Sequence, residues 1–159
     1  AFAKAMEISA KPYEGSSSYY EHLNKYFTER RDKAVKILRS APINYRVFNP
    51  DGGYFVIADI TDAIPSIPVK YFYKEETNKD NTPVGDWTKL KNPDYPADNA
   101  FCRYMSYEWG VTPLPLSPLF ENDRSAPANT WKNTNFIRFA LCKTDQTLEK
   151  LEGLLKKSK

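Results

Sequence analysis

Residues 133–151 read NTNFIRFALCKTDQTLEKL and combine a strand pattern with the pattern of a capped helix. From Asn135 to Cys142 the mostly apolar residues indicate a strand, and Thr144 or Asp145 can cap the helix that follows. We expect this strand and helix to be the last two elements of an α+β fold, in which helices pack on a small sheet. Arg138 is the anomaly here, because a guanidinium beside a core is costly unless an anion meets it.

The preceding part of the chain predicts one long helix and a pair of strands. Ser18 and Glu21 form a capping box, apolar residues then recur at helical spacing, and Pro42 ends the pattern. Two β-rich runs follow, INYRVF and YFVIADI, with the turn residues NPDGG between them. The second run is so continuously apolar that we expect a strand buried on both faces.

Residues 61–96 interrupt this pattern with Pro, Asn, Asp and Lys, and we expect a long irregular insertion there. Beyond it, ADNAFCRYMSYEW predicts a helix with Gly110 as its C-cap, and VTPLPLSPLF predicts an edge strand. The expected order is α-β-β-(long loop)-α-β-β-α, with a small mixed or antiparallel sheet. Residues 1–159 are expected to form a single domain.

Composition excludes several classes of protein. A net charge of +3 over 159 residues, with scattered basic side chains, gives no argument for nucleic acid, and no apolar run is long enough to span a membrane. Cys102 and Cys142 lie in apolar runs without CxxC spacing, so we expect free buried thiols, no metal site and a reducing compartment, cytoplasmic or alternatively mitochondrial. The chain begins without methionine, which suggests a fragment, a processed product or an excised domain.

The chain offers no complete catalytic constellation. His22 has no arguable Ser, Asp or Cys partners and is expected to be a surface residue, and no glycine-rich phosphate loop is present. In a strand, Phe136, Arg138 and Ala140 share one face, and the opposite face is cleanly apolar. Two hypotheses remain open for Arg138. It forms an ion pair with an acid of this chain, or its planar fork binds a ligand carboxylate.

Three segments in order, PDGGYFVIADI, VTPLPLSPLF and FIRFALCKTDQTLEKLEGLL, closely resemble the C-terminal small domain of class I pyridoxal-phosphate-dependent aminotransferases. The helix ERRDKAVKILRS is similar to the family helix before the GGYF strand. The nearest group is the kynurenine/glutamine transaminase and cysteine-conjugate β-lyase branch. The resemblance covers nearly the whole chain except residues 61–96.

This resemblance implies that Arg138 binds the α-carboxylate of the substrate, an amino acid or 2-oxo acid, and that Tyr54 or Phe55 lies near the substrate side chain. It implies pyridoxal phosphate in the complete enzyme, but none held by this chain alone, since the family's Ser-x-x-Lys motif is absent. The implied partners are the large cofactor-binding domain and a second copy of the enzyme. The alternatives are a non-enzymatic interaction module that uses residues 61–96, and an amino-acid sensor.

Overall fold

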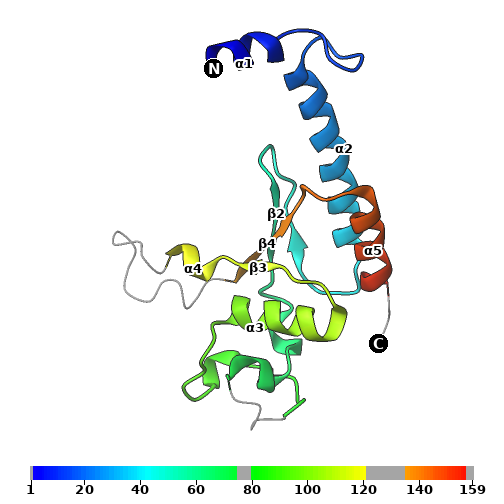
Figure 1. The fold of residues 1–159 in the computed structure, drawn as a ribbon. Helices are drawn as coiled ribbons and strands as arrows, with labels where there is room; N and C mark the ends of the chain where they lie inside the picture. The colour runs from blue at the N-terminus through cyan, green and yellow to red at the C-terminus, as the bar shows by residue number, and fades with distance from the viewer. Residues whose placement is uncertain (1, 75–79, 121–134, 157–159) are drawn as a thin grey trace.

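The protein is described by a computed structural model, which covers residues 2–74, 80–120 and 135–156. At its centre lies a four-stranded antiparallel sheet with the strand order β1-β2-β4-β3 (Figure 1). Helices cover one face of this sheet, and the buried apolar side chains lie between the two layers. The predicted α+β fold with a small antiparallel sheet is confirmed.

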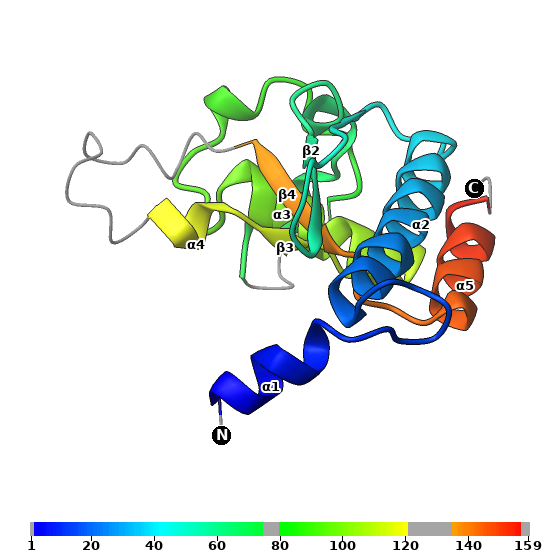
Figure 2. The ribbon, with the colours of Figure 1, turned by 90° about the horizontal axis from the view of Figure 1, so that it is seen from above.

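The helices and strands follow one another in a largely alternating order. Their bounds are α1 Phe2–Ser9, α2 Tyr19–Arg39, β1 Arg46–Val47, β2 Phe55–Asp59, α3 Ala97–Tyr104, β3 Leu114–Pro115, α4 Ser117–Phe120, β4 Phe136–Ala140 and α5 Asp145–Leu155. The helix α1 buries none of its residues and extends away from the sheet (Figures 1 and 2). The four-residue helix α4 follows the edge strand directly, and neither α1 nor α4 is in the predicted order.

The long helix α2 begins with the predicted capping contacts, slightly rearranged. The Ser18 hydroxyl accepts a hydrogen bond from the Glu21 amide at 3.1 Å. The Glu21 carboxylate accepts from the amide of Ser17, at 2.6 Å, instead of from that of Ser18. Both contacts satisfy amides that have no partner inside the helix. The buried residues of α2 lie in its C-terminal half, and the helix runs beside α5 (Figure 2).

The strand β2 corrects one prediction. Val56 and Ala58 are fully buried against the helices, but Ile57, between them, is 39% exposed. The sheet therefore has one covered face and one open face, and β2 is not buried on both. The apolar run misled because Phe55 and Ile57, two of the three residues on the outward face of β2, are apolar as well.

The insertion contributes directly to the core. Its described parts form three short 3₁₀ turns, Ile64–Ser66, Val69–Phe72 and Trp87–Lys89. The side chains of Ile64, Ile67 and Phe72 are fully buried and belong to the same core cluster as those of α3 and the sheet. Packing of this kind makes these residues part of the domain and not an appendage.

Two glycines give a matched test of the backbone. Gly110 ends the helical segment after α3 in the left-handed region, with φ +66°, where a side chain is strained. Gly153 lies inside α5, and apart from its chain neighbours and the backbone of its own helix no atom lies within 4 Å of the place that an alanine methyl group would occupy, so alanine suits it better than glycine. We expect Gly110→Ala to lower the free energy of unfolding by about 1 kcal/mol and Gly153→Ala to raise it by about 0.5–1 kcal/mol. Urea denaturation of the two variants measures both changes, and equal signs would contradict this description.

Candidate functional site

The candidate site is centred on Arg138, in the middle of β4. This strand is an inner strand of the sheet, and Arg138 stands opposite Ile57 of β2 and Leu114 of β3. The predicted alternation of faces holds, because Ile137 and Phe139 are buried in the core and Arg138 lies on the open face. The guanidinium is thus anchored on a rigid element and points away from the helices.

Arg138 has no ionic partner within the described residues. No Asp or Glu of ranges 2–74, 80–120 and 135–156 forms an ion pair with it, and its Nε atom is buried without a hydrogen-bond partner there. A buried donor left unsatisfied is costly, and native structures rarely keep one without a reason. Its position and donor chemistry therefore suit an anion that arrives from outside these residues.

One carboxylate, that of Asp59, lies on the same open face, but groups other than Arg138 bind it. Asp59 of β2 accepts a hydrogen bond from Arg46 at 3.1 Å. It also accepts from the amide and the hydroxyl of Thr61, at 3.0 Å and 2.6 Å. Burial opposes the ionisation of this carboxyl, yet the Thr61 and Arg46 donors lower its pKa below the usual value. The charge of Asp59 is therefore already compensated by groups other than Arg138.

The two aromatic residues predicted for the site lie in different surroundings. The centre of the Arg138 guanidinium lies 4.5 Å from the centroid of the Phe55 ring. Tyr54 is 55% exposed and packs its ring edge-to-face on Phe27 of α2, with 5.2 Å between centroids. The Tyr54 carbonyl accepts a hydrogen bond from Leu141 at 2.7 Å. The structure thus brings Phe55, and not Tyr54, into contact with Arg138.

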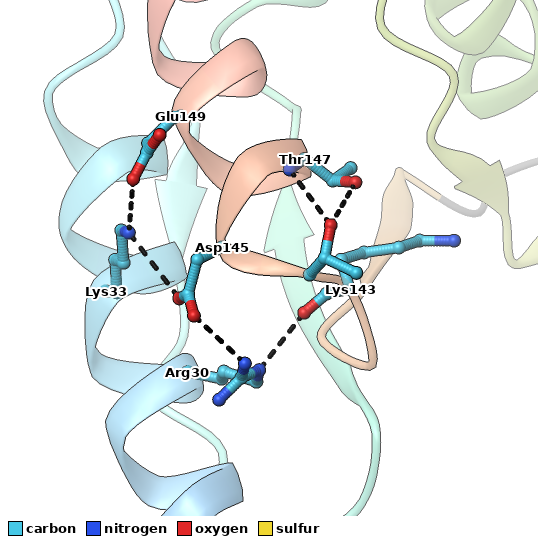
Figure 3. Close-up of polar contacts among 7 residues, drawn as sticks. Arg30, Lys33, Lys143, Asp145, Thr147 and Glu149 are labelled. Carbon is cyan, nitrogen blue, oxygen red and sulfur yellow. Dashed lines mark hydrogen bonds and ion pairs between the residues drawn. The ribbon is translucent and has the colours of Figure 1, made fainter.

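The chain that leaves β4 is held by Arg30 of α2. Its Nε donates to the carbonyl of Lys143 at 3.1 Å, and its Nη2 donates to the carboxylate of Asp145 at 3.1 Å (Figure 3). The guanidinium also lies over the ring of Tyr26, 3.5 Å from the centroid. Arg30 therefore connects the segment that follows β4 to the long helix α2.

Further polar contacts fix the start of α5 (Figure 3). The Thr144 hydroxyl accepts from the amide of Thr147 at 3.2 Å, which confirms it as the predicted cap. Lys33 of α2 lies 3.6 Å from Asp145 and 3.5 Å from Glu149. The segment that follows β4 and the start of α5 are thus held against α2.

Sequence reasoning missed Asp98, a fully buried carboxylate in the first turn of α3. It accepts hydrogen bonds from the amides of Ser117, at 2.7 Å, and Asn99, at 2.8 Å. Burial raises the pKa of Asp98, and these amides oppose that effect. The contact holds the turn after β3, the strand that flanks Arg138. An aspartate between Ala97 and Ala100, inside an apolar segment, was the available signal.

The other candidate groups stay apart from this site. His22 lies among tyrosine rings near the N-terminus of α2, with Nε2 3.7 Å from a carboxylate oxygen of Glu14. Cys102 is buried, as predicted, but Cys142 is exposed, so the prediction of two buried thiols is wrong for the second. The strand β4 has ended at Ala140, so the alternation of faces no longer applies to Cys142.

Over the described ranges, no group of three or more His, Cys, Asp and Glu side chains could hold a metal ion. None of the helices described there is long and apolar enough to cross a membrane.

Comparisons with known proteins find aminotransferases that are similar to this chain, although no family model matches it. Human kynurenine–oxoglutarate transaminase 3 is 26% identical over 156 residues, which are 98% of this chain and 28% of that protein. The kynurenine–oxoglutarate transaminase of Dictyostelium discoideum is 28% identical over 141 residues, 89% of this chain and 28% of that protein. The aspartate aminotransferase of Rhizobium meliloti matches 89% of this chain and 27% of its own chain, with a TM-score of 0.55 and 15% identity, which supports the fold.

The predicted resemblance to class I aminotransferases of the kynurenine transaminase group is therefore confirmed. The chain spans about 28% of the length of the curated relatives that it matches first.

Proposed function

We propose that this chain, a relative of part of the kynurenine transaminases, is the C-terminal small domain of an enzyme that transfers an amino group from an amino acid to a 2-oxo acid. Arg138 binds the α-carboxylate of the substrate. The observation that carries this proposal is the buried Nε of Arg138, which has no hydrogen-bond partner within the described residues.

The arginine side chain suits this role in geometry and in charge. Its guanidinium is always charged and presents donors in a planar fork that matches the two oxygens of a carboxylate. The inner strand β4 holds the backbone of Arg138, and the Arg30 contacts hold the segment that follows this strand, so the arginine projects from a rigid element. Two parallel hydrogen bonds to the carboxylate fix the orientation of the neighbouring Cα, which is a positioning contribution to catalysis.

The cofactor belongs to the remainder of the enzyme in this proposal. Pyridoxal phosphate, when bound, supplies the electron sink for chemistry at Cα. The open face around Arg138 suits a carboxylate, and the sequence contains neither a Ser-x-x-Lys motif nor a glycine-rich phosphate loop. We therefore expect this chain alone to bind no pyridoxal phosphate and to catalyse no transfer. We also expect the complete enzyme to form a homodimer in the cytoplasm, or alternatively in mitochondria.

An assay of the full-length protein from the same gene tests the proposal. We expect it to bind pyridoxal phosphate and to transfer amino groups from amino acids to 2-oxo acids. The isolated chain, mixed with the same cofactor and substrates, should do neither. A full-length protein that neither binds the cofactor nor transfers amino groups would favour the interaction module built on residues 61–96. If the chain alone binds amino acids without any 2-oxo acid, the result would favour the amino-acid sensor.

A further inference from the structure

Phe55 provides the only ring contact of Arg138 in the described part of the chain. The two residues lie on the open face of adjacent strands, and they are diagonal neighbours, since Arg138 pairs with Ile57 and Phe55 pairs with Ala140. The guanidinium carbon lies 4.5 Å from the centre of the Phe55 ring. This distance is typical of a cation held by the electron-rich face of an aromatic side chain.

An aromatic ring and a carboxylate hold a guanidinium in different ways. The aromatic face attracts the charge but accepts no conventional hydrogen bonds, so the donors of the fork stay available. A second arginine on the same open face shows the contrast. Arg46 lies over the ring of Phe48, at 4.9 Å, and in addition donates to Asp59. Arg46 is thus paired within the domain, whereas Arg138 rests on its ring and keeps its Nε without a partner in the described residues.

We propose that Phe55 is a positioning residue, whose ring holds the Arg138 guanidinium on the open face in a state ready to receive a carboxylate. This inference rests on the proposed function of Arg138. It assigns Phe55 a contact with the arginine in place of the predicted contact with the substrate side chain. The ring stabilises one orientation of a long side chain before the ligand arrives, which lowers the ordering cost of binding.

Two substitutions in the full-length enzyme separate the effect of the aromatic face of Phe55 from the effect of its volume. Phe55→Leu keeps an apolar side chain but removes the aromatic face, and Phe55→Tyr keeps that face. We expect Phe55→Leu to raise KM for the amino-acid substrate about 3- to 30-fold with little change in kcat, and Phe55→Tyr to stay within about 2-fold of wild type. For an amine that lacks the α-carboxylate, neither substitution should change kcat/KM.

A second measurement does not depend on activity. In the isotopically labelled chain, the ring current of Phe55 should shift the side-chain proton signals of Arg138. We expect Phe55→Leu to remove this shift and Phe55→Tyr to keep it. Unchanged Arg138 signals in Phe55→Leu would overturn the inference even if one of the enzyme variants fails to fold.

The kinetic outcomes distinguish this inference from the proposed function. If Arg138→Ala raises KM and Phe55→Leu does not, the positioning role is wrong and the carboxylate site stands. If neither changes KM for the amino acid, both are wrong. A Phe55→Tyr variant as impaired as Phe55→Leu, or equal losses with the amine, would also overturn the positioning role, because the ring would then act through another contact.

Discussion

Arg138→Ala in the full-length enzyme should raise KM for an amino-acid substrate by about 30-fold to 1,000-fold, equivalent to about 2–4 kcal/mol of lost binding free energy. The substitution removes the fork that receives the carboxylate and leaves that carboxylate beside apolar Ile57 and Leu114. Arg138→Lys should fall between wild type and Arg138→Ala, because an ammonium keeps the charge but loses the planar pair of donors. Steady-state kinetics over a range of amino-acid concentrations measures each change.

Arg46→Ala is the matched control for these variants. Arg46 lies on the same open face and also stacks on a phenylalanine, but its side chain is 70% exposed and is already paired with Asp59. We expect its removal to change KM less than 2-fold, since an exposed ion pair contributes little. Kinetics of Arg138→Ala no different from those of Arg46→Ala would rule out the carboxylate site.

Phe72→Ala should lower the free energy of unfolding of the chain by about 3–5 kcal/mol. Phe72 is fully buried, although it lies in residues 61–96, where an irregular insertion was predicted. Its carbonyl accepts from the amides of Asp94 and Tyr95, at 3.0 Å and 3.1 Å, so the backbone around it is fixed and cannot easily collapse into a cavity. Urea denaturation followed by far-UV circular dichroism measures the loss.

Tyr107→Ala provides the comparison for Phe72→Ala. Tyr107 is an aromatic residue next to the same turn, with its ring centroid 6.2 Å from that of Tyr71, but it is 75% exposed. Its removal should change the free energy of unfolding by no more than about 0.5 kcal/mol. A loss below about 1 kcal/mol for Phe72→Ala would mean that the insertion does not share the core of the domain.

Local periodicity was enough to predict which residues of β4 share a face of the sheet. The alternation of Ile137, Arg138 and Phe139 follows from backbone geometry alone and is the same in the structure. The helix caps at Ser18 and Thr144 were also predictable, because a cap involves only neighbours in sequence.

Contacts between distant segments were not predictable in this way. The approach of Phe55 to Arg138 depends on the register of two strands that lie about 80 positions apart, and one residue of slip would put Phe55 on the other face. The hydrogen bond that the Ser117 amide donates to Asp98 depends on how α3 packs beside β3. Apart from Asp59 at its end, the apolar run of β2 gave no sign that its outward face is open, since hydrophobicity alone does not distinguish a core from a surface that receives a ligand or another domain.

The central claim is that Arg138 binds the α-carboxylate, and one comparison tests it most directly. The ratio of kcat/KM for an amino acid to kcat/KM for the amine formed by its decarboxylation is measured in wild-type enzyme and in Arg138→Ala. We predict that the substitution lowers this ratio by at least about 30-fold, because only the amino acid carries the group that Arg138 binds. An unchanged ratio, with both substrates affected equally, would contradict the claim.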